Sequence, residues 1–412
     1  MKHGMLVLGG AVVLSVMGAR GVEVAPSETV EVRGEKLKLS KDAPRVWSHG
    51  TKLRRLQTIR PGVGTPAPGA IVPDSIVVRL GETVLTRGED YLFDPLWGSL
   101  GVGPSGKVTP TDEVSVDYRF SLLRIDSLVR TAAGAELVRQ GKSDLNCPEP
   151  PALQPGDTHL ANLYVPYHSD GTNAEVFTVT ETVDKVKTAT TPGRIPRTMA
   201  RIAAGGPLKV VCWGDSVTEG GDVSKPEFRY PDVFGRMLQE KFPSGNITVQ
   251  TVAVGGSNSA QWLWPDKYPF PNPARLEHCK WERVVEAKPD LVTAEFVNDA
   301  GLTPAGVVDR YTEILGRVQA LGAEIILITP HFTMPSMMGF KSVREAERRP
   351  YVLALRQYAA DHGLALADAS ARWEHLAAEG VPYPTLLRNG INHPDDRGHR
   401  LFAEELLKCF AP

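Results

Sequence analysis

Hydrophobic and polar positions follow two different periods along the chain, and the period changes near residue 190. Before that point, short runs alternate apolar and polar side chains, as in residues 113–120 (EVSVDYRF). Such alternation is typical of half-buried strands. The runs at 75–80 and 84–85 are separated by Gly-Glu-Thr, which predicts a hairpin. Short strands between Gly, Pro and Asp turns predict an all-β, sandwich-like domain over residues 22–190, with a small barrel as the alternative.

Beyond a linker expected at residues 191–206, near-continuous apolar runs alternate with helical patterns. The predicted strands are residues 209–213, 247–252, 291–297, 324–329 and 364–368. The predicted helices are residues 231–242, 307–321, 349–362 and 397–410. Apolar strands separated by amphipathic helices indicate a parallel sheet covered on both faces. The pattern therefore predicts a flavodoxin-like, three-layer α/β domain over residues 207–412.

The first 21 residues have the pattern of a signal peptide. Lys2 precedes an apolar segment at residues 5–17, and small residues follow at 18–21. A membrane anchor is the competing interpretation, but the segment is short for a membrane span. We therefore expect a secreted or periplasmic protein with no stable membrane insertion after cleavage.

The charge and the cysteine content of the chain argue against two classes of partner, nucleic acid and metal ions. The 46 basic and 48 acidic residues give a net charge of −2, which offers no electrostatic reason to expect nucleic acid. The four cysteines are far apart and lack CxxC spacing, so we expect no zinc site. No other metal spacing is present, and we predict no metal and no cofactor.

Ser216 stands directly after the first strand of the predicted parallel sheet, in VVCWGDSVTEG. Active sites of such sheets lie beyond the carboxyl ends of the strands. Gly214 permits a sharp exit from the strand, and the serine that follows can point its hydroxyl into the crevice. Gly-Asp-Ser is also common in ordinary turns, so this tripeptide alone does not establish a nucleophile.

Three further segments are expected at the same crevice. The strand near 247–254 ends in Gly255-Gly256-Ser-Asn-Ser, and the strand at 291–297 ends in Asn298. The segment NHPDDRGH, which contains His393, precedes the last helix. Together they supply a nucleophile, backbone and amide donors, and a base.

These four segments resemble the SGNH, or GDSL-type, hydrolase family over roughly residues 205–412. Ser216, Gly256, Asn298 and His393 match the four residues that name the family, and Gly255 is an alternative to Gly256 by one position. The resemblance implies a serine nucleophile (Ser216), a base (His393) and an oxyanion hole formed by Ser216, Gly256 and Asn298. No cofactor is implied.

The chain departs from the family pattern at two positions. Phe296 stands where block three commonly has glycine, although Asn298 and Asp299 are kept. Gly390 stands three residues before His393, where the family usually has an aspartate. Three alternatives follow: a Ser–His dyad, orientation of His393 by an asparagine or backbone carbonyl, or a carboxylate from elsewhere.

Residues around these segments are expected to support the site. Asp215 is expected to brace the loop of the nucleophile, and Asp299 the loop of Asn298. Trp262 and Trp264 flank the block-two loop. Such residues usually pack in the core, but beside a nucleophile they can stack on sugar rings.

The resulting hypothesis is a secreted serine esterase that removes O-acetyl groups from carbohydrate through an acyl-serine intermediate. Its partners would be small-molecule or polysaccharide esters. A lipase, thioesterase or O-acyltransferase on the same site is one alternative. A catalytically impaired glycan-binding module is another, because the usual acid is missing.

Overall fold

The computed structural model describes residues 23–59 and 64–410, so the signal peptide expected at residues 1–21 lies outside the described residues. The chain divides into two compact units. The first ends at Thr182 but also includes Ala377–Thr385 and Asn389–Ile391, which the pattern had assigned to the second domain. The second unit holds the remaining residues from Val183 onward.

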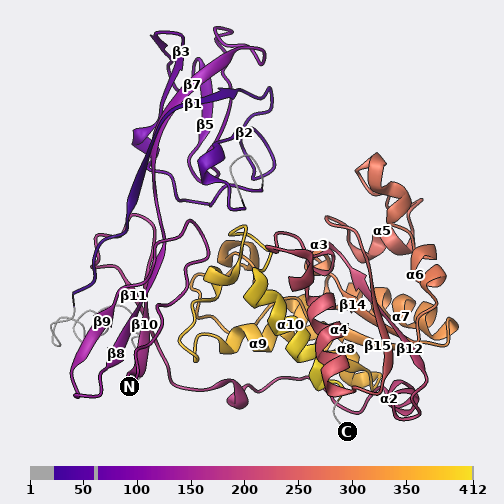
Figure 1. Cartoon of the computed structure of the whole chain (residues 1–412). Helices are drawn as coiled ribbons and strands as arrows, with labels where there is room; N and C mark the ends of the chain where they lie inside the picture. The colour runs from indigo at the N-terminus through magenta and orange to yellow at the C-terminus, as the bar shows by residue number, and fades with distance from the viewer. Residues whose placement is uncertain (1–22, 60–63, 411–412) are drawn as a thin grey trace, which may run out of the picture. The chain divides into compact units, whose positions relative to one another are not determined.

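The first unit is built from antiparallel sheets, which confirms the predicted all-β, sandwich-like architecture (Figure 1). One sheet has the order β1 (Thr29–Lys38), β7 (Glu113–Ser121), β3 (Val77–Leu80) and β4 (Thr83–Val84). Another has the order β11 (Glu175–Thr178), β10 (Thr158–Val165), β8 (Arg124–Arg130) and β9 (Glu136–Arg139). A third has the order β2 (Thr51–Lys52), β6 (Ser99–Val102) and β5 (Tyr91–Asp94). Strand β7 alternates as predicted, because Val114, Val116 and Tyr118 are buried.

The second unit contains a five-stranded parallel sheet, which confirms the predicted α/β class. Its strand order is β13 (Asn246–Ala253), β12 (Pro207–Gly214), β14 (Leu291–Glu295), β15 (Glu324–Ile328) and β16 (Ala365–Ala367). The longer helices are α2 (Pro196–Ala203), α4 (Tyr230–Lys241), α7 (Pro304–Ala320), α8 (Pro350–Asp361) and α10 (Asp396–Lys408). The shorter helices are α3 (Ser216–Glu219), α5 (Ser259–Leu263), α6 (Glu282–Ala287) and α9 (Ala369–His375). Helix α2 lies within the linker expected at residues 191–206, where the sequence also indicates a short helix over residues 197–203.

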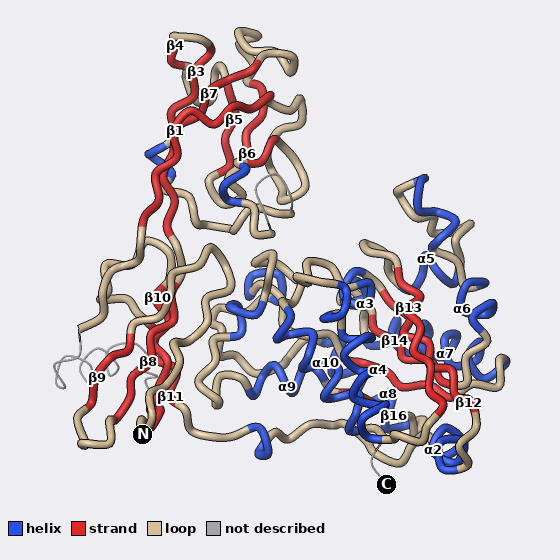
Figure 2. Tube along the Cα trace, viewed as in Figure 1, coloured by secondary structure: helices blue, strands red, loops and turns tan. Residues whose placement is uncertain are grey.

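Strand β12 is apolar on both faces because both faces of the sheet are covered by helices (Figure 2). Its residues Val210 and Cys212 pack with α2, α4 and α10. Its residues Val211 and Trp213 pack on the other face, with side chains of α5, α6, α7 and α8. Burial of both faces explains why this strand reads as a continuous apolar run rather than an alternating one.

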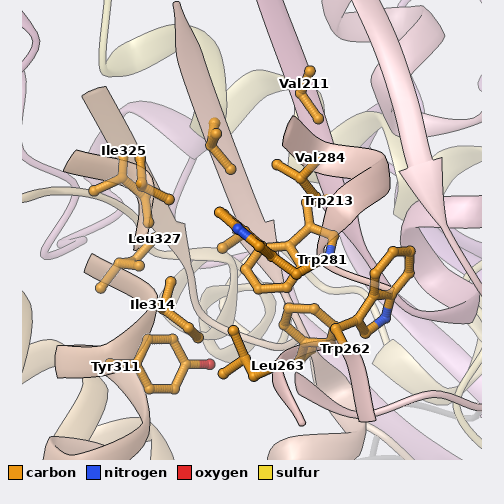
Figure 3. Close-up of a cluster of buried hydrophobic side chains, with 14 of the residues drawn as sticks. Val211, Trp213, Trp262, Leu263, Trp281, Val284, Tyr311, Ile314, Ile325 and Leu327 are labelled. Carbon is orange, nitrogen blue, oxygen red and sulfur yellow. The ribbon is translucent and has the colours of Figure 1, made fainter. Parts of the chain in front are cut away.

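Tryptophans form the centre of the second of these two layers (Figure 3). Trp213 lies edge-to-face against Trp262, Trp281 and Phe296, with ring centroids 6.0, 5.2 and 4.9 Å away. Tyr311 of α7 belongs to the same cluster. Edge-to-face pairs add to the burial of apolar area, so this cluster anchors the loop after β13 on the sheet.

The carboxyl ends of three neighbouring strands determine where the candidate site lies. Strands β12, β13 and β14 are neighbours, and their carboxyl ends lie at one edge of the sheet. Gly214 ends β12 where a Cβ atom would lie 2.3 Å from the Glu295 carbonyl oxygen, so glycine is required for the exit. Within the described ranges, no helix is long and apolar enough to cross a membrane.

Candidate active site

Ser216 is the first residue of helix α3, directly after strand β12. Asp215 caps this helix, since its Oδ1 accepts the backbone N–H of Val217 at 3.1 Å. The first N–H groups of a helix have no acceptor within the helix, so the Ser216 N–H points out of its N-terminus. Ser216 is 8% exposed, at the edge of the sheet where the strands end.

His393 lies against Ser216. Its Nε2 is 2.9 Å from Ser216 Oγ, a hydrogen-bond distance. Two backbone hydrogen bonds fix the loop of His393: Arg388 N–H donates to the His393 carbonyl, and Asp395 N–H donates to the Leu386 carbonyl. Asp395 also caps α10 by accepting the Gly398 N–H at 2.9 Å, as expected of an acidic residue at a helix N-terminus.

A carboxylate reaches the other nitrogen of His393. Asp222 Oδ2 is 2.7 Å from His393 Nδ1, so Ser216, His393 and Asp222 form one hydrogen-bonded chain. Of the three alternatives left by the sequence, this geometry matches a carboxylate from elsewhere. Asp222 comes six residues after Ser216, in the loop that follows α3, and not from the position of Gly390.

The loop after α3 has an unusual backbone that makes this contact. Gly220 ends the helix with φ at 87°, and Asp222 has φ at 65°, which is rare outside glycine. A Cβ on Gly221 would lie 2.8–2.9 Å from the His393 ring, so glycine is needed for the ring to approach. In the sequence, the consecutive glycines of Gly220-Gly221-Asp222 are the one signal of this turn. They do not identify Asp222 as the partner of His393.

The loops after β13 and β14 carry the remaining donors that are expected at the oxyanion hole. The Gly255 N–H already donates to Glu219 Oε2 at 2.8 Å, whereas Gly256 has φ at 83°, which favours glycine. Asn298 Nδ2 donates one hydrogen to the Ser257 carbonyl at 2.9 Å and, as an amide nitrogen, carries a second. This arrangement favours Gly256 over Gly255 as the block-two donor.

Asp215 and Asp299 hold the loops of the site together through hydrogen bonds. Asp215 Oδ2 accepts the Asn298 N–H at 3.0 Å, so Asp215 connects the loop of the nucleophile to that of Asn298. Asp299 accepts both the N–H and the hydroxyl of Ser259. It therefore ties the Asn298 loop to the start of α5.

A third carboxyl group, Glu295, is buried near the two aspartates. Its Oε2 accepts the Thr218 hydroxyl at 3.2 Å. Burial raises the pKa of Asp215, Glu295 and Asp299, because a carboxylate loses hydration there. The backbone hydrogen bonds to Asp215 act against burial and favour its charged form.

Trp262 and Trp264, the two tryptophans expected to line the substrate site, pack elsewhere or only partly at the surface. Trp262 is fully buried in the tryptophan cluster, and its indole N–H donates to Ser257 Oγ at 2.8 Å, so the expectation that it lines the substrate site is wrong. Its apolar ring is needed to fill the layer behind the sheet. Trp264 is half-buried against the same cluster, and the guanidinium of Arg310 lies 5.0 Å from its ring centroid.

A cleft of about 390 Å³ opens beside Asn298 and Asn392, the residue before His393. Its lining mixes polar, charged and apolar side chains. They are Val297, Asn298, Ala300, Thr333, Met337, Met338, Gly339, Arg348, Arg349, Pro350 and Asn392. Across residues 23–59 and 64–410, no group of three or more His, Cys, Asp or Glu is placed to hold a metal ion.

Two further histidines lie behind the site, and both are completely buried. His331 Nε2 donates to the Asn392 carbonyl at 2.8 Å, and His399 Nδ1 accepts the Tyr230 N–H at 3.3 Å. Burial lowers the pKa of His331 far below its usual range and that of His399 to about 3. Both rings are therefore neutral in the folded protein at neutral pH.

These buried histidines predict a loss of stability in acid. A histidine whose pKa is lowered by folding binds protons better in the unfolded chain. Its contribution to the free energy of unfolding is therefore complete above about pH 6.5 and is lost as the pH falls below that value. The loss is about 1.4 kcal/mol per pH unit for each histidine. We expect His399→Gln to reduce the loss between pH 6.5 and 5.0 by about 2 kcal/mol, measured by urea unfolding. An unchanged loss of stability would contradict this assignment. The pKa of Asp215 is raised rather than lowered, but Asp215 is present in both proteins and does not affect the comparison.

Comparisons with known proteins give one family and several structures of low similarity. Residues 212–401 match the GDSL-like Lipase/Acylhydrolase family. No curated protein sequence matches the chain. A two-domain esterase active on acetylated mannans is 19% identical, with a TM-score of 0.41 over 53% of this chain and 53% of that one. The chain thus spans about half the length of this esterase.

Two smaller structures match almost over their whole length. An α/β hydrolase from the metagenome of Lake Arreo, Spain, is 19% identical, with a TM-score of 0.38 over 50% of this chain and 99% of that one. An acetyl xylan esterase is 20% identical, with a TM-score of 0.37 over 48% and 98%. Residues 212–401 contain the Ser216, Gly256, Asn298 and His393 segments described above. This part of the chain therefore belongs to the GDSL-like Lipase/Acylhydrolase family.

Proposed function

We propose that the protein hydrolyses carboxylic esters, with Ser216 as nucleophile, His393 as general base and Asp222 as the group that orients His393. The observation that carries this proposal is the hydrogen-bonded chain from Ser216 Oγ through His393 to Asp222. A serine hydroxyl is a weak nucleophile until a base accepts its proton. A carboxylate on Nδ1 fixes the tautomer whose Nε2 can accept that proton and stabilises the imidazolium that results.

The reaction proceeds in two halves. Ser216 Oγ attacks the ester carbonyl carbon while His393 Nε2 takes its proton, and His393 then gives that proton to the departing alcohol. Water next attacks the acyl-Ser216 carbonyl, with His393 taking a proton from the water. Collapse of the second intermediate releases the carboxylic acid and returns the proton to Ser216 Oγ.

The negative charge on the carbonyl oxygen in each intermediate needs donors already in place. We assign this task to the backbone N–H groups of Ser216 and Gly256 and to the second hydrogen of Asn298 Nδ2. Asp215 supports the arrangement because it holds both the Val217 and the Asn298 N–H groups. Asp299 supports it through Ser259.

We propose O-acetylated carbohydrate as the substrate class. The cleft beside Asn298 offers polar and charged groups (Thr333, Arg348 and Asn392) together with Met337 and Met338. Such a mixed lining suits a hydroxyl-rich alcohol better than a long acyl chain, which needs a mostly apolar site. Export through residues 1–21 would bring the enzyme to polysaccharide outside the cytoplasm. The contact between Asp222 and His393 supports hydrolysis over an impaired glycan-binding module, since it gives the histidine a carboxylate partner.

Two measurements test the proposal. Acetate release from acetylated oligosaccharides should be catalytic, and a fluorophosphonate should abolish it while adding one phosphonyl group to the peptide that contains Ser216, as seen by mass spectrometry. Transfer of acetyl to a sugar acceptor instead of water would indicate an acyltransferase. Activity only on long-chain esters or thioesters would indicate a lipase or thioesterase. No labelling and no hydrolysis of any ester would overturn the proposed reaction.

A further inference from the structure

Glu219 connects two parts of the site that come from different strands. It is the last residue of α3, the helix that Ser216 begins. Its Oε2 accepts the Gly255 N–H from the loop after β13 at 2.8 Å. Its other oxygen pairs with the guanidinium of Arg275, which lies on the 3-10 helix Pro273–His278. One carboxylate thus joins the helix of the nucleophile, the block-two loop and a third segment.

The packing at Gly255 shows how close these parts are. A Cβ atom on Gly255 would lie 2.7 Å from Glu219 Oε2, 3.4 Å from Ser216 Cβ and 3.5 Å from Arg275 Nη1. Any side chain at this position would push the carboxylate away. Glycine at 255 therefore lets Glu219 hold the backbone directly, next to the nucleophile.

The peptide after this contact is the one that matters for the reaction. Gly255 and Gly256 are consecutive glycines, and glycine restricts its own backbone angles least of all residues. Unless a hydrogen bond fixes the backbone at Gly255, the Gly255–Gly256 peptide could rotate and turn the Gly256 N–H away from Ser216. A hydrogen bond to a charged carboxylate is stronger than one between neutral groups. Glu219 is therefore well suited to hold the Val254–Gly255 peptide, whose N–H it accepts, and so to limit rotation of the Gly255–Gly256 peptide that follows.

We propose that Glu219 is a positioning residue that aims the Gly256 N–H at the oxyanion, and that Arg275 holds Glu219 in place. The inference rests on the proposed function, since it assigns Gly256 the oxyanion role. The Glu219 and Arg275 side chains are 40% and 34% exposed. Ion pairs at such exposure contribute little to stability, so the pair acts on geometry rather than on folding.

Kinetics of two Glu219 variants test the role. Glu219→Leu removes the acceptor, and we expect kcat for p-nitrophenyl acetate to fall about 30- to 100-fold with KM within threefold, since a misplaced donor acts on the transition state. Glu219→Gln keeps an oxygen for the Gly255 N–H and should restore kcat to within about tenfold of wild type. Arg275→Met should cost about three- to tenfold, because Glu219 keeps its bond to Gly255.

A matched control and a readout without turnover complete the test. Glu277→Gln, on the same 3-10 segment, breaks the pair of the exposed Glu277 with Lys280 and should leave kcat unchanged. Hydrogen–deuterium exchange over residues 254–262 should become faster in Glu219→Leu than in wild type, whether or not the protein hydrolyses esters. The thermal midpoints of all variants should agree within a few degrees.

Each contrary result has its own meaning. A kcat within threefold of wild type in Glu219→Leu, or a kcat in Glu219→Gln as low as in Glu219→Leu, would overturn the positioning role. Unchanged exchange over residues 254–262 would do so even in a protein without activity. If the wild-type protein hydrolyses no ester, while Glu219→Leu still exchanges faster than wild type, the proposed function is overturned and the contact remains a structural one.

Discussion

Replacing Ser216 with alanine is expected to lower kcat for p-nitrophenyl acetate by a factor on the order of 10⁵–10⁶, because removal of a serine nucleophile leaves only binding and the oxyanion donors. Ser216 Oγ is the atom 2.9 Å from His393 Nε2, so its hydroxyl is placed to give its proton to that nitrogen. Initial rates of the purified protein, with the Ser216→Ala protein measured alongside, give the result directly.

The variant should remain folded. The change removes one oxygen from a residue that is only 8% exposed and leaves the helix-capping bond from Val217 to Asp215 intact. Ser342→Ala, at an exposed position of the loop before α8, is a suitable control and should keep full activity. Equal rates in the wild type and Ser216→Ala would show that Ser216 is not the nucleophile.

The α/β half of the fold was predictable because its signal is periodic. Each predicted strand of the sheet is present within a few residues, for instance β12 (Pro207–Gly214) against a predicted 209–213. Helices α5 and α6 were missed because they have five and six residues, too few for a helical period to emerge. Strands β8 and β9 of the first unit were missed as well; β8 is buried at nearly every position and therefore lacks alternation.

The site was predictable to the extent that it follows strand ends. Ser216, Gly256 and Asn298 each lie within three residues of the end of a parallel strand, and parallel strands bring their ends to one edge. Asp222 was not predictable, because its approach to His393 depends on a left-handed turn at Gly220-Gly221-Asp222. Nothing in the spacing of residues encodes where such a turn aims its side chain.

The aromatic prediction failed for a related reason. Nearness in sequence to the block-two loop placed Trp262 beside the nucleophile, but the short helix α5 turns its ring into the tryptophan cluster. A tryptophan buries a large apolar area, and this burial competes with any role at the surface. The cleft beside Asn298 has Asn392, Thr333 and Arg348 among its polar lining residues, and Trp262 is not among the residues that line it.

Asp222→Asn is expected to lower kcat about 10³- to 10⁴-fold, the scale seen when the acid of a serine hydrolase triad becomes its amide. Asparagine has the size of aspartate and also tolerates φ near 65°, so the loop should keep its conformation. What changes is the partner of His393 Nδ1. An amide cannot stabilise the imidazolium as a carboxylate does, and its NH₂ group favours the tautomer in which Nε2 carries the proton and cannot accept one from Ser216.

The size of this loss decides between two accounts of the site. A decrease of less than tenfold would mean that Ser216 and His393 work as a dyad and that the 2.7 Å contact with Asp222 is incidental. Asp232→Asn, which breaks a partly exposed pair with Arg229, removes the same charge elsewhere and should leave kcat unchanged. A large decrease in Asp222→Asn alone, with an unchanged thermal midpoint, would show that a residue six positions after the nucleophile performs the task usually assigned to the loop before the histidine.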